Sequence, residues 1–413
     1  MEICNMHPRE LKIENFTYNL PNEKIAYTPA NPRDSSKLLI YKNATISTDT
    51  YQHISEYLPK DSVLVFNDTK VIKSRIFFQN ETGATIEVFC LEPYGENLNY
   101  EDYFQKQGSV LWTCLIGKVA KWRSPKLSKK LTINNQDVEL SAEIVEKLGD
   151  SYVVKLSWTP SEIPFAEVVE VAGVTPLPPY IKRIADKTDE ETYQTVYSEH
   201  DGSVAAPTAG LHFTKRILDD LSERKIPTLF TTLHVGAGTF KPVKSETMED
   251  HIMHSECMTI TLDFLESLLS KIDKAIIPVG TTSMRTIESI YWMGNKIANN
   301  PNIEFENLKV TQWEPYETET THSANEALSA LINWIKKHGQ THISVETEII
   351  IAPSYKFRIA KALVTNFHQP QSTLLLLVSA LIGEKWHEIY DYALENDFRF
   401  LSYGDGSLLF PQD

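Results

Sequence analysis

The feature that most constrains the fold is a run of short β-rich segments with no helical pattern between them. The segments are residues 85–91, 109–116, 130–133, 138–145 and 152–158. Polar or glycine-containing loops separate them, and apolar and polar side chains partly alternate within them. Strands spaced this closely pair with one another as an antiparallel sheet or a small barrel. We therefore predict an inserted antiparallel β-barrel-like domain over residues 76–162.

The chain on both sides of this region alternates strand-like and helix-like patterns. Residues 64–66 and 275–279 are short apolar runs that are typical of buried strands. Helix-like periodic patterns lie between such runs, and this alternation predicts an α/β domain. We expect an α/β fold in which residues 1–75 and 163–413 form one mixed α/β main domain.

Local capping signals predict where several helices of the main domain begin. Ser323 and Glu326 match a capping box. Asp263 is the predicted N-terminal cap of an earlier helix, and Asp189 is predicted to begin a helix that continues through Tyr197.

The charge of the chain bears on whether it binds nucleic acid. A formal net charge of −15 excludes a surface coated in positive charge, although a local basic patch can still bind RNA. Such a patch is predicted on a loop of the inserted domain, at Lys118, Lys121, Trp122, Arg123 and Lys126. Cations beside an aromatic ring suit a phosphate backbone and an unstacked base. The alternative is a solvated hairpin tip.

The chain lacks the signals of secretion, of a membrane span and of common nucleotide folds. There is no phosphate-binding GxxxxGK[ST] motif, and Lys241 stands where a dinucleotide fingerprint needs its third glycine. The cysteines form no CxxC pair, and the N-terminus has no apolar signal core. Residues 374–382 are the longest apolar run, far below the ~20 residues of a spanning helix. We expect a cytoplasmic protein without membrane contact.

Three glycine-bearing turns carry side chains that can perform chemistry. They contain Thr208, Gly210 and His212; His234, Gly236, Gly238 and Thr239; and Thr281, Thr282, Ser283 and Arg285. Glycine lets the backbone approach a ligand closely, and a helix N-terminus favours an anion. The turns therefore predict a shared site, with three ordinary connections as the alternative.

Two further groups of polar residues are candidates for binding. His251, His254 and Glu256 resemble metal ligands, but a zinc site needs another ligand and supporting contacts, so no metal is predicted. A metal-dependent hydrolase built on these three residues stays an alternative. Asn366 and His368, before the apolar run, line a pocket or cap the following helix.

A series of motifs runs along the chain in the order PRDSSKLL (32–39), FNDTKV (66–71), PPYIKR (178–183), YQTVY (193–197), GSVAAPTAGLHFT (202–214), TLHVGAGTF (232–240), HIMHSE (251–256), VGTTSMR (279–285), TNFH (365–368) and YGD (403–405). Taken together, these motifs resemble the S-adenosylmethionine:tRNA ribosyltransferase-isomerase family. Each motif alone is weak, whereas the ordered set is highly specific.

The resemblance implies a transferase-isomerase that modifies tRNA in queuosine biosynthesis. Such enzymes move the ribosyl moiety of S-adenosylmethionine onto 7-aminomethyl-7-deazaguanine in tRNA, giving epoxyqueuosine and releasing adenine and methionine. The implied partners are tRNA and S-adenosylmethionine as co-substrate, with no other cofactor. The family's mixed α/β fold with an inserted β-barrel-like domain agrees with the prediction above. The oligomeric state stays open, with a monomer favoured.

The implied reaction assigns roles to particular residues. A base is needed, and His212 or His234 is predicted to serve. Departing adenine needs a proton donor, predicted to be His368 or Asp405, and Arg285 is predicted to hold the methionine carboxylate. The remaining predicted substrate-binding residues are Asn67, Asp68, Arg75, Tyr180, Arg183, Thr208, Gly210, Gly236, Gly238, Thr239, Thr281, Thr282, Ser283 and Asn366.

Two alternatives within the resemblance stay open. Ser354, Lys361 and Gln369 stand where the family usually has glycine, aspartate and an apolar residue, and residues 295–342 are longer than expected. These departures bear on the acceptor base more than on S-adenosylmethionine, so one alternative is a divergent paralogue that uses S-adenosylmethionine on another acceptor. A non-catalytic RNA-binding homologue is the second alternative, and the retained histidines argue against it.

Overall fold

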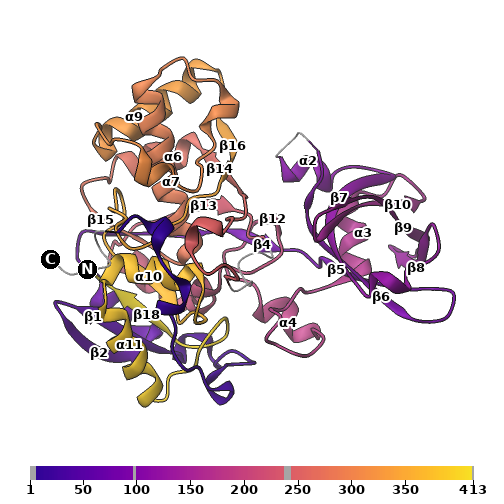
Figure 1. Ribbon diagram of the computed structural model, residues 1–413, viewed down its shortest axis with the longest axis horizontal. Coiled ribbons are helices and arrows are strands. Elements are labelled where there is room, and N and C mark those ends of the chain that lie inside the picture. The colour runs from indigo at the N-terminus through magenta and orange to yellow at the C-terminus, as the bar shows by residue number, and fades with distance from the viewer. Residues whose placement is uncertain (1–5, 96–98, 237–242, 412–413) are drawn as a thin grey trace.

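The computed structural model describes residues 6–95, 99–236 and 243–411. Figure 1 shows a main body that contains both ends of the chain and a β-rich body beside it. The predicted α/β fold, with a mixed main domain and an inserted antiparallel β-barrel-like domain, is confirmed.

The β-rich body is a curled sheet of seven strands in the order β11-β5-β6-β7-β10-β9-β8. Its strands are β5 (Arg75–Gln79), β6 (Thr85–Pro93), β7 (Ser109–Gly117), β8 (Leu127–Ile133), β9 (Gln136–Leu148), β10 (Ser151–Thr159) and β11 (Gly173–Val174). Every pairing in it is antiparallel. The domain boundaries at 76 and 162 stay a prediction, and the sheet itself takes in Arg75 and β11 outside them.

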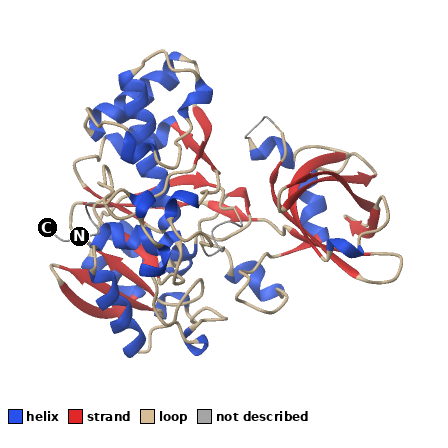
Figure 2. Cartoon of the chain, viewed as in Figure 1, coloured by secondary structure: helices blue, strands red, loops and turns tan. Residues whose placement is uncertain are grey.

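Two helices complete the β-rich body. The helix α3 (Phe165–Ala172) lies inside the curve of the sheet, as Figure 2 shows. Phe165 packs there against Trp112, with tilted rings whose centroids are 5.0 Å apart, in a core formed by the apolar face of the strands. The short helix α2 (Tyr100–Phe104) lies against β12 of the main body.

The main body contains a five-stranded sheet in the order β15-β3-β13-β14-β16. The strands are β15 (Ala275–Pro278), β3 (Ser62–Asn67), β13 (Thr228–Leu233), β14 (Glu256–Thr261) and β16 (His342–Thr347). The first three run parallel, and β14 and β16 pair antiparallel. All six residues of β3 are buried, as a central parallel strand requires.

A second sheet of the main body has the order β17-β18-β1-β2. It comprises β17 (Leu363–Asn366), β18 (Gly406–Leu409), β1 (Lys37–Lys42) and β2 (Thr45–Thr50). A bridge between Val279 and Val364 joins its edge to the end of β15. A pair of short strands, β4 (Thr69–Val71) and β12 (His200–Ser203), completes the sheets.

Helices cover these sheets. They are α1 (Ile54–Tyr57), α4 (Lys187–Thr192), α5 (Lys215–Glu223), α6 (Leu262–Leu269), α7 (Thr281–Asn299), α8 (Glu314–Glu317), α9 (Ala324–Lys337), α10 (Thr373–Ile382) and α11 (Lys385–Glu395). The helix α7 is buried along most of its length, and at Gly294 the backbone of α9 comes so close that a Cβ atom would collide with Ala327. Within the described residues, none of the helices combines the length and apolarity that crossing a membrane requires.

One of the three predicted helix starts is confirmed, and the other two differ from the structure. The capping box of Ser323 and Glu326 is formed as predicted at the start of α9. The cap of α6 is Thr261, whose hydroxyl accepts from the N–H of Phe264 at 3.2 Å, so the prediction of Asp263 was wrong. The helix predicted from Asp189 to Tyr197 begins earlier, at a capping box on Asp186, and ends at Thr192.

Candidate active site

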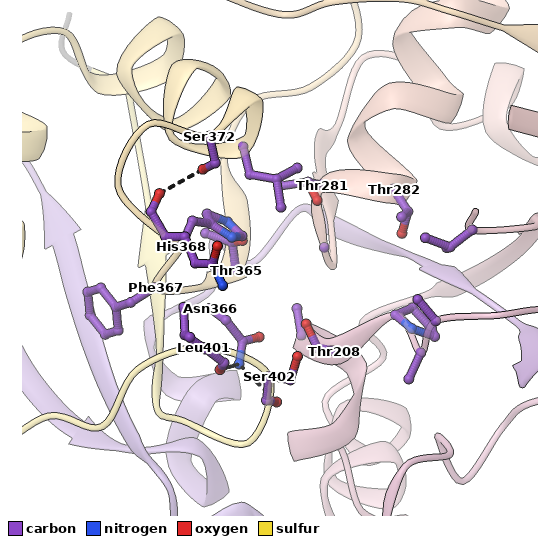
Figure 3. Close-up of a pocket in the computed structure, with 18 of the residues that line it drawn as sticks. Thr208, Thr281, Thr282, Thr365, Asn366, Phe367, His368, Ser372, Leu401 and Ser402 are labelled. Carbon is purple, nitrogen blue, oxygen red and sulfur yellow. Dashed lines mark hydrogen bonds between the residues drawn. The ribbon is translucent and has the colours of Figure 1, made fainter. Parts of the chain in front are cut away.

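Five of the matched motifs meet in one pocket of the main body, called the central pocket here. It is lined by Tyr180, Ala205, Ala206, Pro207, Thr208, Ala209, Val235, Gly280, Thr281, Thr282, Thr365, Asn366, Phe367, His368, Gln369, Ser372, Leu374, Leu401 and Ser402. The space between these residues is about 740 Å³, which includes open solvent at the mouth. Figure 3 shows His368 and Asn366 on one side of it and Thr282 on the other.

The first turn of α7 forms one wall of the central pocket. Gly280 precedes the helix with a φ of 92°, a conformation that favours glycine, and no side chain caps the helix start. The open N–H groups and the helix dipole at Thr281 and Thr282 favour a negatively charged or carbonyl group of a ligand.

Two buried polar atoms of this pocket have no hydrogen-bond partner. They are Oγ1 of Thr282 and Oδ1 of Asn366. A buried polar atom left unpaired costs about 1–3 kcal/mol. Both atoms line the central pocket, so a polar ligand bound there would satisfy them.

His368 is the histidine that lines the central pocket. It follows β17, and its Nε2 lies 2.9 Å from the hydroxyl of Thr365. The main chain is held by Tyr390, whose hydroxyl accepts from the His368 N–H at 3.1 Å. Burial lowers the pKa of His368 to about 3, so the imidazole is neutral at pH 7.

His212 touches the central pocket through Asn366. The amide of Asn366 lies 3.3 Å from Nε2 of His212, and the His212 ring stacks on Tyr51 with centroids 4.1 Å apart. Burial, with a smaller contribution from Arg399, lowers the pKa of His212 to about 3. The geometry therefore makes His212 a support for Asn366.

His234 and Asp405 lie outside the residues that line the central pocket. His234 is 3.0 Å from the hydroxyl of Thr69 and stacks on Tyr100 of α2, with centroids 4.2 Å apart. Asp405 accepts from the main-chain N–H groups of Lys37 at 2.9 Å and Arg399 at 2.7 Å. Their predicted roles as base and acid stay predictions, and the structure gives both residues structural contacts.

The three buried histidines make the stability of the fold depend on pH. Burial also lowers the pKa of His234 to about 3, against about 6.5 in an unfolded chain. The unfolded state therefore binds protons first, and stability should be complete above pH 6.5 and fall as the pH drops towards 3. Each histidine contributes about 1.4 kcal/mol per pH unit inside this window.

Urea denaturation between pH 7.5 and 4.5 measures this dependence. The variant His212→Asn should lose stability less steeply with falling pH than the wild type. The variant His342→Asn, at an exposed position of β16, should keep the wild-type slope. Equal slopes for His212→Asn and the wild type would contradict the assignment of His212.

Arg285 lies in a second pocket, called the side pocket. It is lined by His251, Met253, His254, Glu256, Arg285, Ile349, Ile350, Ile351, Thr373, Leu374 and Leu377. The guanidinium of Arg285 donates through one terminal nitrogen to Glu256, and through Nε to the carbonyl of Ile349 at 3.1 Å. Its remaining nitrogen, Nη2, is buried without a partner. Arg285 is thus not among the residues around the central pocket, and its role towards a methionine carboxylate stays a prediction.

Several other predicted residues hold the framework near the site. Asn67 donates to the carbonyl of Leu233 at 2.9 Å and accepts from its N–H at 3.0 Å, which ties β3 to β13. Arg75 pairs with Glu87 at 2.6 Å, and Arg183 donates to Asp189 at 2.8 Å.

Some of the small residues in the predicted set also have structural contacts. Gly210 is required by packing, because a Cβ atom there would collide with the hydroxyl of Tyr197. The hydroxyl of Ser283, in the first turn of α7, donates to the carbonyl of Val279 just before the helix at 2.9 Å. Gly236 follows Val235 at the central pocket, whereas Gly238 and Thr239 lie outside the described residues.

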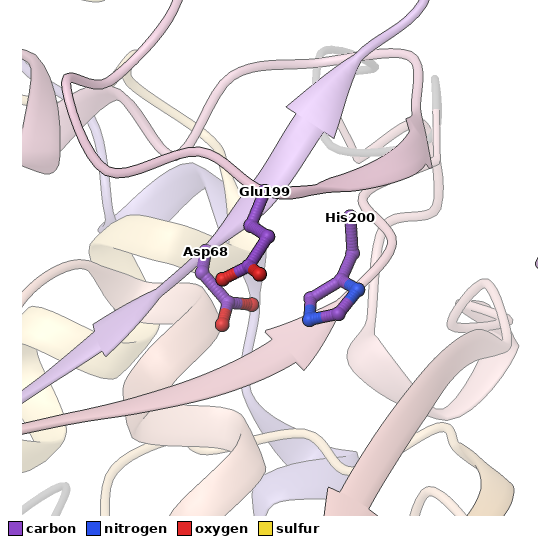
Figure 4. Close-up of side chains that lie close together, drawn as sticks. All are labelled: Asp68, Glu199 and His200. Atoms are coloured by element: carbon purple, nitrogen blue, oxygen red, sulfur yellow. The ribbon is translucent and has the colours of Figure 1, made fainter.

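Among the described residues, one group of three brings metal-ligand atoms within 4.8 Å of one another: Asp68, Glu199 and His200, shown in Figure 4. One oxygen of Asp68 accepts from the hydroxyl of Thr232 at 2.7 Å. The alternative metal site at His251, His254 and Glu256 gains no support from the geometry, because Glu256 is paired with Arg285.

The basic run lies between β7 and β8. Lys118, Lys121, Arg123 and Lys126 are exposed. Trp122 packs partly buried against the core of the β-rich body, which leaves less of its ring for stacking on a base. The cations of the predicted RNA contact are therefore accessible, and the aromatic ring is partly buried in the fold.

Sequence reasoning missed part of the central pocket. Ser402 donates from its N–H to the hydroxyl of Tyr180 at 3.1 Å and lines the pocket beside Leu401. No local motif marks Ser402 or Leu401, because they reach the pocket only through long-range folding.

The chain thus combines a mixed α/β main body, an inserted β domain and two pockets that share Leu374. The family model described as queuosine biosynthesis protein matches residues 13–409. A protein of Trichlorobacter lovleyi named S-adenosylmethionine:tRNA ribosyltransferase-isomerase is 34% identical over 406 residues, covering 96% of this chain and 99% of its own. A protein of Finegoldia magna with the same name is 36% identical, covering 97% of this chain and 98% of its own.

The crystal structure of S-adenosylmethionine tRNA ribosyltransferase from Thermotoga maritima aligns with a TM-score of 0.45 at 24% identity, over 95% of this chain and 99% of that one. The family model and the two full-length relatives decide the question: this chain belongs to the queuosine biosynthesis protein family of S-adenosylmethionine:tRNA ribosyltransferase-isomerases. The resemblance inferred from the ordered motifs is confirmed.

Proposed function

We propose that this chain is an S-adenosylmethionine:tRNA ribosyltransferase-isomerase. It transfers and isomerises the ribosyl moiety of S-adenosylmethionine onto 7-aminomethyl-7-deazaguanine in tRNA, with release of adenine and methionine. Family membership over nearly the whole chain supports the reaction, and the observation that carries it is the convergence of the family's motifs on the central pocket. A tRNA substrate favours the cytoplasm as the place of action.

The central pocket is the proposed site for S-adenosylmethionine. The first turn of α7 suits the carboxylate of the methionine part. The unpaired oxygens of Thr282 and Asn366 suit hydroxyl or amino hydrogens of the nucleoside part. His368 is the proposed group that exchanges a proton with the reacting substrates, since its side chain lines the pocket.

The departures from the family pattern mostly avoid this pocket. Ser354 has a φ of 79°, in the region that favours glycine, and Lys361 is exposed. Neither lines the central pocket, whereas Gln369 does. This distribution favours the usual reaction over a paralogue with a different acceptor.

An adenine-release assay tests the proposal. The protein is incubated with S-adenosylmethionine and an anticodon stem-loop RNA that carries either 7-aminomethyl-7-deazaguanine or guanine at the wobble position. Adenine should appear only with the modified RNA. Absence of adenine with the modified RNA, from protein that binds S-adenosylmethionine, would contradict the proposed acceptor.

A further inference from the structure

The side pocket joins one negative and one positive side chain at its floor. Glu256 begins β14 and is 4% exposed, and Arg285 lies in the second turn of α7 and is 7% exposed. Of the Arg285 nitrogens, Nη1 and Nε are engaged by Glu256 and Ile349, and Nη2 is buried and unpaired. An unpaired buried guanidinium nitrogen calls for an acceptor from outside the protein.

The walls of this pocket are apolar and come from separate elements. Ile349, Ile350 and Ile351 follow β16, and Leu374 and Leu377 belong to α10. Apolar walls around a paired carboxylate and guanidinium suit a flat ring with a polar edge.

We propose that the side pocket binds the acceptor base of the tRNA, and that Glu256 and Arg285 read its guanine-type edge. This inference rests on the proposed function and names the part of the molecule that selects the base. A guanine-type ring carries a ring N–H and an exocyclic amino group next to a carbonyl oxygen. A carboxylate accepts from the two donors, and a guanidinium donates to the carbonyl. Glu256 would therefore meet the ring N–H and the amino group, and Arg285 the carbonyl beside them.

The methionine part of S-adenosylmethionine is the competing occupant, and the geometry disfavours it. A carboxylate is bound most strongly by two parallel donors of one guanidinium. Arg285 has a single nitrogen without a partner, which suits a carbonyl oxygen better than a carboxylate. The uncapped start of α7 already offers a carboxylate site in the central pocket.

The two pockets adjoin, as a transfer between two substrates requires. Leu374 lines both of them. Thr281 and Thr282 at the central pocket and Arg285 at the side pocket lie within about one turn of α7, a rise of about 5.4 Å. A base held by Arg285 therefore has its aminomethyl group within reach of a ribosyl group in the central pocket.

The mouth of the side pocket is built to meet a macromolecule. Between His251 and Met253, the side chain of Ile252 is 83% exposed. Gln312 holds this loop on both sides of Ile252, donating to the carbonyl of His251 at 2.8 Å and accepting from the N–H of Met253 at 2.9 Å. An apolar side chain fixed at the rim suits stacking against a base next to the one taken into the pocket. Gln312 belongs to the long segment of residues 295–342, so one role of this segment is to hold the rim of the side pocket in place.

Fluorescence anisotropy with two anticodon stem-loop RNAs tests the proposal. One RNA carries 7-aminomethyl-7-deazaguanine at the wobble position, and the other carries the same base without its 2-amino group. The wild-type protein should bind the second RNA roughly ten- to a hundredfold more weakly, because a donor to Glu256 is lost. Equal affinity for the two RNAs would overturn the proposal, and this comparison needs no variant to fold.

A second set of anisotropy measurements uses the variant Glu256→Gln. Its matched control is Glu249→Gln, on the exposed turn before the loop. Glu256→Gln should lose most of the discrimination between the RNAs and keep its affinity for S-adenosylmethionine within about threefold, a shift below the ~1.4 kcal/mol of a tenfold change. The reverse pattern, with weakened S-adenosylmethionine and unchanged discrimination, would overturn the proposal in favour of the methionine part. Because anisotropy needs no turnover, it decides this question even where a lack of adenine release contradicts the proposed function.

Discussion

Replacing His368 with alanine is expected to lower the rate of adenine release by about 10²- to 10⁴-fold, the contribution of a positioned proton-transfer group. The side chain lines the central pocket, and its Nε2 is oriented by the hydroxyl of Thr365 at 2.9 Å. Affinity for S-adenosylmethionine should change much less than the rate, since the unpaired oxygens of Thr282 and Asn366 remain. Single-turnover kinetics with the modified stem-loop RNA and equilibrium dialysis with S-adenosylmethionine measure the two effects.

Two further variants make this experiment decisive. His387→Ala removes a half-exposed histidine of α11 and should leave the rate unchanged. His212→Asn should act through Asn366 and weaken binding together with the rate. A His368→Ala protein that releases adenine within threefold of the wild-type rate would show that another residue transfers the proton.

Replacing Glu288 with alanine is expected to destabilise the protein by about 3–5 kcal/mol, because each buried donor left without its acceptor costs about 1–3 kcal/mol. Glu288 lies on α7 and is 0% exposed. Its carboxylate accepts from the hydroxyl of Tyr355 at 2.8 Å and from three main-chain N–H groups, those of Arg358, Ile359 and Ala360, at 2.9–3.0 Å. Removal leaves four donors without their acceptor, three of them in buried hydrogen bonds, which is the physical origin of the loss.

Urea denaturation at pH 7.5 measures this change in the free energy of unfolding. Glu306→Ala, at an exposed position after the C-terminal end of α7, is the matched control and should shift stability by less than about 0.5 kcal/mol. A Glu288→Ala protein as stable as this control would show that the segment before β17 does not depend on the carboxylate.

The parts of the fold that the sequence predicts correctly are those with local causes. The capping box of Ser323 and Glu326 needs only residues three apart, and it forms at the start of α9. The closely spaced strands pair as predicted, because short loops leave them few other partners. Tyr193 ends α4 instead of continuing it, because its ring packs against Tyr403, a contact between distant parts of the chain.

The same distinction separates the site residues that could be predicted from those that could not. The ordered motifs pointed to Thr208, Thr282 and His368, and the structure brings all three to the central pocket. Choosing among the histidines required knowing which one reaches the pocket, and that depends on how β17 and α10 are placed. The pairing of Arg285 with Glu256 joins residues 29 positions apart on different elements, and no spacing rule predicts it.

The paired strands β5 and β11 have a consequence for how this long chain folds. The chain passes into the β-rich body along β5 and returns along β11, and Arg75 pairs there with Val174. The two crossing points are thus about 5 Å apart, the spacing of neighbouring strands. Once the β-rich body has folded, the roughly 100 residues between these points close a loop no wider than a tight turn. Pairing β3 with β13 then costs much less entropy than the number of residues between the two strands implies. We therefore expect the β-rich body to fold before the main sheet is completed.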